Sequence, residues 1–168
     1  TAQTVTRFGL GFAPDTWDSL VRAMKALGYS EQELFDGGLV RHGRSGGVYD
    51  TFRNRLMFPV IDVRGNVIGF SGRILGDGEP KYMNSPETIV FSKSHNLFAL
   101  NLAKKSKCGY IILAEGNIDV ASLHQAGFDS AVASLGTSLT PEQARLLSRY
   151  TSEIVIAYDN DGAGQKAS

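Results

Sequence analysis

From residue 97 onward, apolar runs of strand length alternate with helical patterns, and this alternation constrains the fold more than any other feature. It predicts helices over 97–107, 118–126 and 141–149, strands over 110–114, 130–134 and 153–158, and a further helix starting near Gly164. Thr140, Pro141 and Gln143 have the spacing of a capping box with proline at the first helical position. Strands joined through helices by short links predict a parallel sheet with right-handed crossovers.

Three polar segments follow the predicted strands: Glu115-Gly116, Leu135-Gly136-Thr137 and Asp159-Asn160-Asp161-Gly162. Parallel strands end at one edge of their sheet, where ligands of open α/β sheets bind. An Asp-x-Asp pair in extended backbone places two carboxylates on one side, and carboxylate oxygens suit Mg²⁺. Turn formation by Asp, Asn and Gly is the alternative explanation. We favour a metal site because a Glu-Gly pair follows a second strand.

The first part of the chain has a mixed pattern. It predicts a helix over 15–27, a second helix capped by Ser30 and Glu33, a mobile glycine-rich basic loop over 41–47, and a hairpin of strands 55–63 and 67–74. Pro59 indicates that the first hairpin strand is an edge strand or is locally broken. The expected core residues are Trp17, Leu20, Met24, Phe58 and Ile68 in this part, and Ile111, Leu113, Val132, Val155 and Ile156 in the sheet.

Charge is unevenly distributed although the net charge is zero. Residues 41–107 contain 11 basic and 5 acidic side chains, whereas residues 110–168 contain 3 basic and 7 acidic ones. This distribution fits a protein that grips a polyanion with one part and places metal ions with another, although clustering of solvated charges explains it equally well. Cys108 is the only cysteine, so we expect no zinc cluster and a reducing, cytoplasmic setting. No membrane-spanning or signal segment is expected.

Several motifs together resemble a known family. Glu115-Gly116-Asn117-Ile118-Asp119 and Asp159-Asn160-Asp161 resemble the Toprim signature of primases, topoisomerases and related nucleases. More specific are Gly69-Phe70-Ser71-Gly72-Arg73, the run from Pro80 to Thr88 (PKYMNSPET), and Ala133-Ser134-Leu135-Gly136-Thr137. These segments resemble the catalytic core of bacterial DnaG-type DNA primases, and the resemblance extends from Arg7 to Gly164. It implies an α+β basic lobe over 1–96, followed over 97–168 by a Toprim-like Rossmannoid parallel α/β sheet that is incomplete at its C-terminal end.

The resemblance also implies site residues. Glu115, Asp159 and Asp161 match catalytic, metal-binding carboxylates, and Asp119 matches a further acidic position for Mg²⁺ or Mn²⁺. The matched template- and nucleotide-binding positions are Arg73, Lys81, Tyr82, Asn84, Lys93, Gly136 and Thr137. Without the resemblance Tyr82 would be assigned to the core; with it, the ring is expected to stack on a base. Asn117 replaces the family's usual tyrosine, which affects the expected local packing rather than the metal ligands.

The implied reaction is primer synthesis directed by a single-stranded DNA template. A 3′-hydroxyl attacks the α-phosphate of an incoming ribonucleoside triphosphate and pyrophosphate leaves, with Glu115 as metal ligand and general base. Helicase and replisome contacts are expected through domains absent here, so we expect this chain to be a fragment that folds but is weak or inactive alone. The alternatives are a Toprim nuclease using the same carboxylates and an inactive fragment that binds single strands. His42, His95 and His124 are not expected to be catalytic, because lone histidines more often lie in surface loops or pack within the fold.

Overall fold

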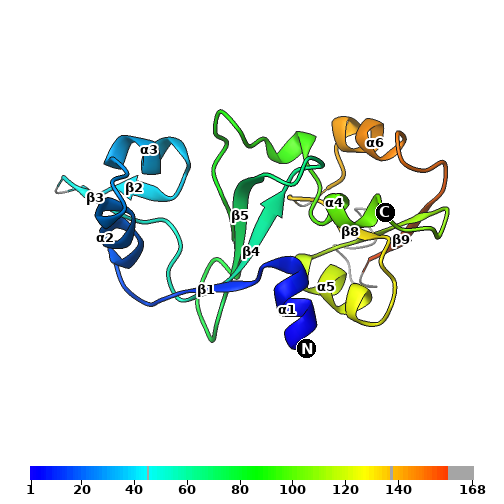
Figure 1. Ribbon diagram of the computed structural model, residues 1–168, viewed down its shortest axis with the longest axis horizontal. Helices are drawn as coiled ribbons and strands as arrows, with labels where there is room; N and C mark the ends of the chain where they lie inside the picture. The colour runs from blue at the N-terminus through cyan, green and yellow to red at the C-terminus, as the bar shows by residue number, and fades with distance from the viewer. Residues whose placement is uncertain (45, 137, 159–168) are drawn as a thin grey trace. The chain divides into compact units, whose positions relative to one another are not determined.

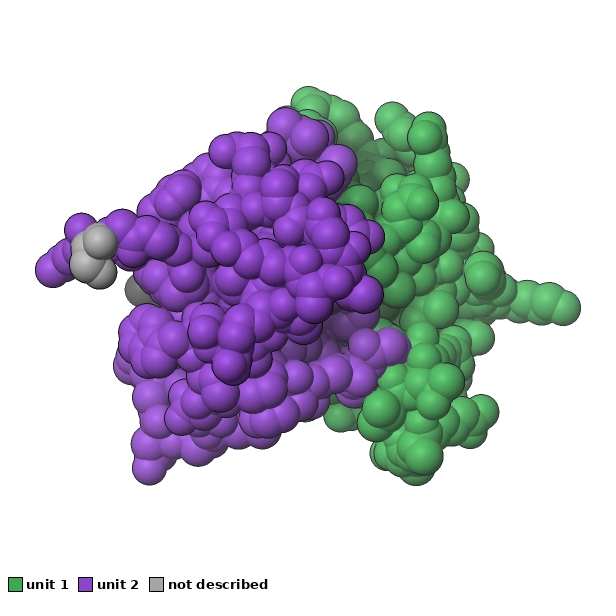
Figure 2. All heavy atoms as spheres, turned by 60° about the vertical axis from the view of Figure 1, so that its left-hand side comes forward, with its two compact units in different colours: residues 1–8, 60–68, 92–168 green, residues 9–59, 69–91 purple. Residues whose placement is uncertain are grey.

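The computed structural model describes residues 1–44, 46–136 and 138–158. The chain forms two compact units, each assembled from separated stretches of sequence and coloured separately in Figure 2. The first unit contains residues 1–8, 60–68 and 92–168, and the second contains residues 9–59 and 69–91. The expected boundary between residues 96 and 97 stays a prediction. In the described part of the chain, no helix has the length and apolar character needed to cross a bilayer.

The first unit contains the parallel sheet that the alternating pattern predicts. Its strands are β7 (Ile111–Ala114), β8 (Ala131–Ala133) and β9 (Ile154–Ala157), in the order β8-β7-β9. β7 pairs in parallel with both neighbours, and Ala114 lies beside Ala133 on one side and Ala157 on the other. Helices α5 (Asn117–Gln125) and α6 (Pro141–Leu147) lie on opposite sides of this sheet (Figure 1), as right-handed crossovers in opposite directions require.

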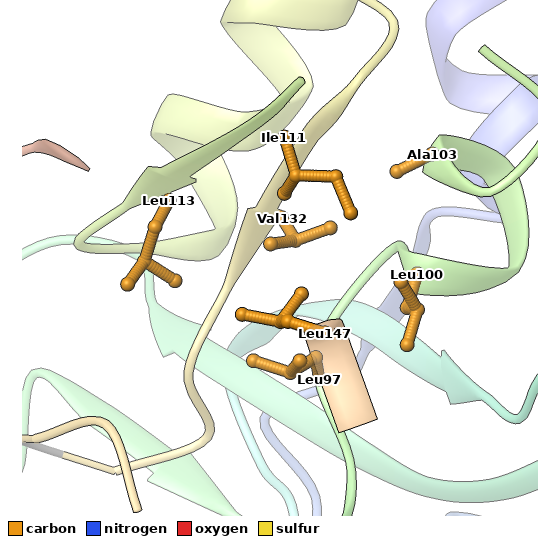
Figure 3. Close-up of a cluster of buried hydrophobic side chains, with 7 residues drawn as sticks. All are labelled: Leu97, Leu100, Ala103, Ile111, Leu113, Val132 and Leu147. Carbon is orange, nitrogen blue, oxygen red and sulfur yellow. The ribbon is translucent and has the colours of Figure 1, made fainter. Parts of the chain in front are cut away.

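Alternate residues of β7 supply the core of this unit. Ile111 and Leu113 pack into an apolar cluster completed by Leu97, Leu100, Ala103, Val132 and Leu147 (Figure 3). On the N-terminal helix α1 (Ala2–Phe8), Phe8 stacks on Phe98 with ring centroids 5.7 Å apart. Phe8 also packs edge-on against His124 of α5, so the N-terminal helix adds buried aromatic contacts to this unit.

Two expectations about this unit are wrong. The helix expected over 97–107 is only α4 (Leu100–Ala103), because Phe98 bridges Ala133 and Ala99 adopts a positive φ of 64°, which diverts the backbone before the helix starts. Val155 and Ile156 were expected in the core but are 43% and 50% exposed. β9 is an edge strand whose four residues are all exposed.

The second unit contains a mixed lobe. Helices α2 (Ser19–Ala26) and α3 (Glu31–Asp36) accompany a short hairpin of β2 (Val40–His42) and β3 (Val48–Asp50), and their core is formed by Val21, Leu34 and Val40. An antiparallel sheet has the order β1-β4-β5-β6, with β1 (Gly11–Ala13), β4 (Arg55–Ile61), β5 (Val67–Ile74) and β6 (Tyr82–Asn84). The tip of the β4–β5 hairpin, residues 60–68, belongs to the first unit. The expected hairpin and the Ser30–Glu33 capping box are confirmed.

Corrections in this lobe come from partners that are distant in sequence. The helix expected from residue 15 begins at Ser19, because the Asp50 carboxylate accepts hydrogen bonds from the backbone N–H groups of Leu20 (2.8 Å) and Val21 (3.0 Å). The loop expected over 41–47 begins in strand β2, which pairs with β3. β4 is not an edge strand, but its pairing with β1 ends at Met57, two residues before Pro59.

Trp17 was expected in the core but is 66% exposed. The Arg53 guanidinium lies 4.2 Å from the centroid of its ring. The prediction that Trp17 lies on the apolar face of the helix is therefore wrong, because the helix starts two residues after it.

Candidate functional site

Glu115 and Asp119 lie at the carboxyl end of β7, where the chain turns into α5. The Asp119 Oδ2 atom accepts a hydrogen bond from the N–H of Gly116 at 3.0 Å, which caps the start of the helix. A side chain at residue 116 would meet this oxygen, since a Cβ built there lies 3.0 Å from it. Glycine at position 116 thus allows the Asp119 carboxylate to fold back to the end of β7, which also carries Glu115.

The carboxyl end of β9 lies at the same edge of the sheet. Ala157 lies beside Ala114, so Tyr158 follows its strand as Glu115 follows β7. Partial burial raises the pKa of the Tyr158 hydroxyl, and the neighbouring negative charge of Glu115 raises it further. The Glu115 carboxylate therefore lies close enough to Tyr158, the residue that follows β9, to raise the pKa of its hydroxyl.

The expected metal ligands Asp159 and Asp161, and the expected contact residue Thr137, lie outside the described residues. Of the described side chains, no group of three or more His, Cys, Asp or Glu is close enough to hold a metal ion. The described donors are the exposed carboxylates Glu115 and Asp119. One or two carboxylates at an exposed edge fit Mg²⁺, which keeps several water ligands.

Gly136 lies after β8, the third strand that ends at this edge. It is exposed, and its carbonyl accepts a hydrogen bond from Ser134 Oγ at 3.2 Å. Leu135, between these residues, is buried and anchors the start of the loop. The sequence expectation that loops after β7 and β8 share an edge is confirmed.

In the second unit, the predicted basic and aromatic residues gather on the β5–β6 pair. Arg73 lies opposite Tyr82 and Ser71 opposite Asn84, so the side chains of each pair lie on the same face. The Arg73 guanidinium lies 5.7 Å from the Tyr82 ring centroid, and this ring is 41% exposed. A surface pocket of about 490 Å³ is lined in part by Arg73, Asp77, Glu79 and Lys81.

Arg55 is a residue of this region that sequence reasoning missed. It is buried, and its guanidinium donates to the carbonyls of Gly72 (3.2 Å), Pro80 (2.9 Å) and Lys81 (3.4 Å). Burial lowers the pKa of Arg55, and the nearby positive charge of Arg53 lowers it further. Arg55 fastens the segment that carries Lys81 to β5, an arrangement that no local sequence pattern indicates.

A second basic and aromatic group, also missed, lies in the same unit. Arg53 lies over both Trp17 and Tyr49, with its guanidinium 4.2 Å and 5.1 Å from their ring centroids. A pocket of about 500 Å³ is lined by these two aromatic residues, His42, Arg44, Val48 and the hairpin glycines Gly43, Gly46 and Gly47. We name this group, Trp17, Tyr49 and Arg53, the Trp17 cluster.

Lys93 lies in the first unit, in the 3₁₀ turn η1 (Lys93–His95). In this turn the ring Nδ1 of His95 lies within hydrogen-bond distance of both Ser92 Oγ (3.2 Å) and Ser94 Oγ (2.9 Å). These side-chain contacts order the turn locally.

The histidines have structural surroundings. His124 is buried, its Nε2 lies 2.9 Å from the Ala131 carbonyl, and its ring packs edge-on against Phe8. Burial lowers the pKa of His124. His42 is exposed and its ring lies 4.6 Å from that of Phe35. Asn117 is buried at the first position of α5, so the fold accommodates the smaller polar side chain there.

The parallel β-α-β-α-β unit with carboxylates after its first strand defines a Toprim-like α/β domain. The Toprim-like family profile matches residues 112–168, and the profile of the DNA primase catalytic core, N-terminal domain, matches residues 1–104. The chain belongs to the DnaG-type DNA primase family.

Individual relatives agree with this assignment. The chain is 54% identical to a DNA primase of Clostridium acetobutylicum over 98% of its own length and 28% of that protein. A solved DNA primase domain from Pseudomonas aeruginosa has a TM-score of 0.91 and 43% identity, covering 99% of this chain and 53% of the other. A DnaG primase catalytic domain bound to single-stranded DNA has a TM-score of 0.88 at 42% identity, covering 99% of this chain and 55% of the other. The chain spans less than a third of the curated relatives it matches.

Proposed function

We propose that this chain is part of a primase catalytic core that synthesises short RNA primers on a single-stranded DNA template. The observation that carries the proposal is that β7 and β9 end at the same edge of the sheet. There, the charge of Glu115 raises the pKa of Tyr158, the residue that precedes Asp159 in the sequence. The ligand of a related catalytic domain, single-stranded DNA, supports the choice of template.

Glu115, Asp119, Asp159 and Asp161 are the proposed ligands for Mg²⁺ or Mn²⁺, with Glu115, Asp159 and Asp161 as the catalytic set. Such ions, when bound, neutralise the charge of the nucleoside triphosphate and make the attacking hydroxyl more acidic. Glu115 accepts the proton of the 3′-hydroxyl while the hydroxyl oxygen bonds to the α-phosphate of the ribonucleotide and the bond to the leaving pyrophosphate breaks. The loop of Gly136 and Thr137 adjoins the nucleotide. Most of the rate enhancement comes from positioning and electrostatics.

The basic residues hold the template strand. Arg73, Lys81 and Lys93 neutralise backbone phosphates, Asn84 supplies a polar contact, and Tyr82 offers a ring face to a base. The Trp17 cluster extends this binding role, because it combines the exposed ring of Trp17 with the guanidinium group of Arg53. Among the described residues that line the adjacent pocket, none is acidic. The proposed setting in the cell is the bacterial cytoplasm. The proposed partners are the replicative helicase and other replisome proteins, which would contact parts of the full-length protein that this chain does not span.

Because the chain alone is expected to be weak or inactive, the test places it in a full-length member of the family in exchange for the matching segment. The assay contains a single-stranded template, labelled ribonucleoside triphosphates and Mg²⁺ or Mn²⁺. Template-dependent ribonucleotide incorporation supports a primase, strand cleavage instead supports a Toprim nuclease, and metal-independent binding without turnover supports a binding fragment. Glu115→Gln should lower incorporation by roughly 100-fold or more, because it removes a charged group from the reacting centre. The control is Glu153→Gln, at the amino end of β9 and thus the opposite edge of the same sheet. Equal loss from both variants would contradict the proposal.

A further inference from the structure

The turn that carries Lys93 is held by side chains from the start of α6. Thr140 Oγ1 donates a hydrogen bond to the carbonyl of Ser94 at 2.7 Å. Gln143 Nε2 donates to the carbonyls of both Lys93 and Asn96 at 2.9 Å. About fifty residues of sequence separate the donors from the acceptors, so these three bonds are tertiary contacts rather than local ones.

The same two side chains also close the capping box of α6. Thr140 Oγ1 accepts from the N–H of Gln143 at 3.1 Å, and Gln143 Oε1 accepts from the N–H of Thr140 at 3.0 Å. Gln143 is only 1% exposed. Because a buried amide is costly unless hydrogen-bonded, its orientation is fixed by these bonds. The Thr140 hydroxyl and the Gln143 amide therefore each take part in capping α6 and in hydrogen bonding to the turn that carries Lys93.

The capping box of α3, formed by Ser30 and Glu33, shows that capping a helix does not require hydrogen bonds to a distant turn. In α3, Ser30 Oγ lies 2.7 Å from Glu33 Oε2, and the Ser30 N–H donates to the same oxygen at 2.8 Å. Both residues are exposed, and these bonds join only the two box residues. The tertiary bonds of Thr140 and Gln143 therefore serve the turn over Lys93–Asn96 rather than the helix end.

We propose that Thr140 and Gln143 are positioning residues that hold the backbone of Lys93, so that its ammonium meets a strand phosphate. This inference rests on the proposed template contact of Lys93. A lysine side chain has four rotatable bonds, so fixing its backbone reduces the ordering cost of each phosphate contact. α6 also follows the loop of Gly136, so the same grip ties the loop after β8 to the Lys93 turn.

The test measures binding of a fluorescein-labelled oligothymidylate by anisotropy over a series of KCl concentrations. Each phosphate contact on a single strand contributes about 0.7 to the slope of log affinity against log salt. Lys93→Ala should lower the slope by about this amount. Gln143→Met, which keeps the side-chain size and removes both donors, should lower the slope equally, and the double variant should show no further loss.

Thr140 supplies a conservative pair for the same test. Thr140→Val should lower the slope, whereas Thr140→Ser, which keeps the hydroxyl, should retain it. Ser30→Ala is the matched control, because it removes a capping hydroxyl without a tertiary grip; it should lower the melting temperature and leave the slope unchanged. Circular dichroism at the assay temperature verifies that each variant is folded, and should one Gln143 or Thr140 variant unfold, the other decides.

Two contrary results are distinguishable. If Lys93→Ala lowers the slope but Gln143→Met and Thr140→Val leave it unchanged, the inference is wrong and the proposed contact of Lys93 stands. If Lys93→Ala leaves both affinity and slope unchanged, the proposed contact itself fails and the inference fails with it.

Discussion

The indole of Trp17 has a chemical environment unlike that expected for a core residue. Its ring is two-thirds exposed, meets Tyr49 at an angle of 71°, and lies under the Arg53 guanidinium. Arg55, two residues along the chain, is instead buried among carbonyls. Sequence motifs therefore predicted that Glu115 and Asp119 lie after strand β7. They did not predict the surroundings of these two arginines, because those depend on partners that are distant in sequence.

Trp17 is the only tryptophan of the chain, which makes it a site-specific reporter. Titration with a single-stranded oligonucleotide should quench its fluorescence. Trp17→Leu should weaken strand binding about 5- to 150-fold, since stacking on one base contributes about 1–3 kcal/mol. Phe12→Leu, at an exposed ring on β1, is the control. If anisotropy detects binding of the oligonucleotide without any change in Trp17 emission, the proposal that the Trp17 cluster binds the template is wrong.

His124 predicts a pH dependence of stability. Burial lowers its pKa below the usual value of 6.5, with Arg7 acting in the same direction and Asp129 and the Ala131 carbonyl opposing it. The unfolded chain therefore binds a proton at a higher pH than the folded chain, so the free energy of unfolding falls as the pH drops below about 6.5.

Denaturant unfolding between pH 7.5 and 5 measures this effect. His124→Gln keeps an N–H donor for the Ala131 carbonyl and should flatten the dependence, whereas His42→Gln, at an exposed histidine, serves as the control. An unchanged pH dependence in His124→Gln would show that another group is responsible.

At the scale of the element, local patterns predicted most of the first unit. The strands, α5, the capping box of α6 and the parallel pairing are confirmed, because short buried strands between capped helices have clear local signals. Helix α4 and the burial of β9 were predicted wrongly. The first depends on the bridge between Phe98 and Ala133, and the second on the position of β9 at the sheet edge.

The difference between the central and the edge strand is measurable. Leu113 in β7 is fully buried, so Leu113→Ala should lower the free energy of unfolding by about 2–5 kcal/mol. Val155→Ala in β9 should cost less than about 1 kcal/mol, because its side chain remains partly in water. Urea denaturation of both variants provides the comparison, and similar losses would show that β9 is buried in solution.

At the scale of the whole molecule, the two compact units are interleaved along the sequence. The chain changes unit after residues 8, 59, 68 and 91, whereas the two family profiles divide it once, between residues 104 and 112. A single linear boundary is what sequence motifs can reveal, because each motif is contiguous. The buried layers are not contiguous, and this explains why the composition of the core was harder to predict than the position of Glu115.

This interleaving makes the chain a candidate for fragment complementation. A break between Lys107 and Cys108 would leave Leu97, Leu100 and Ala103 on one polypeptide and Ile111, Leu113 and Val132 on the other, although they share one core. We expect 1–107 and 108–168, produced together, to co-elute on size exclusion and to separate only in denaturant, whereas independent elution would contradict this. The severed chain would then keep its architecture through the burial of these shared apolar side chains alone. The peptide link between the exposed residues Lys107 and Cys108 would serve only to raise the effective concentration of the two pieces.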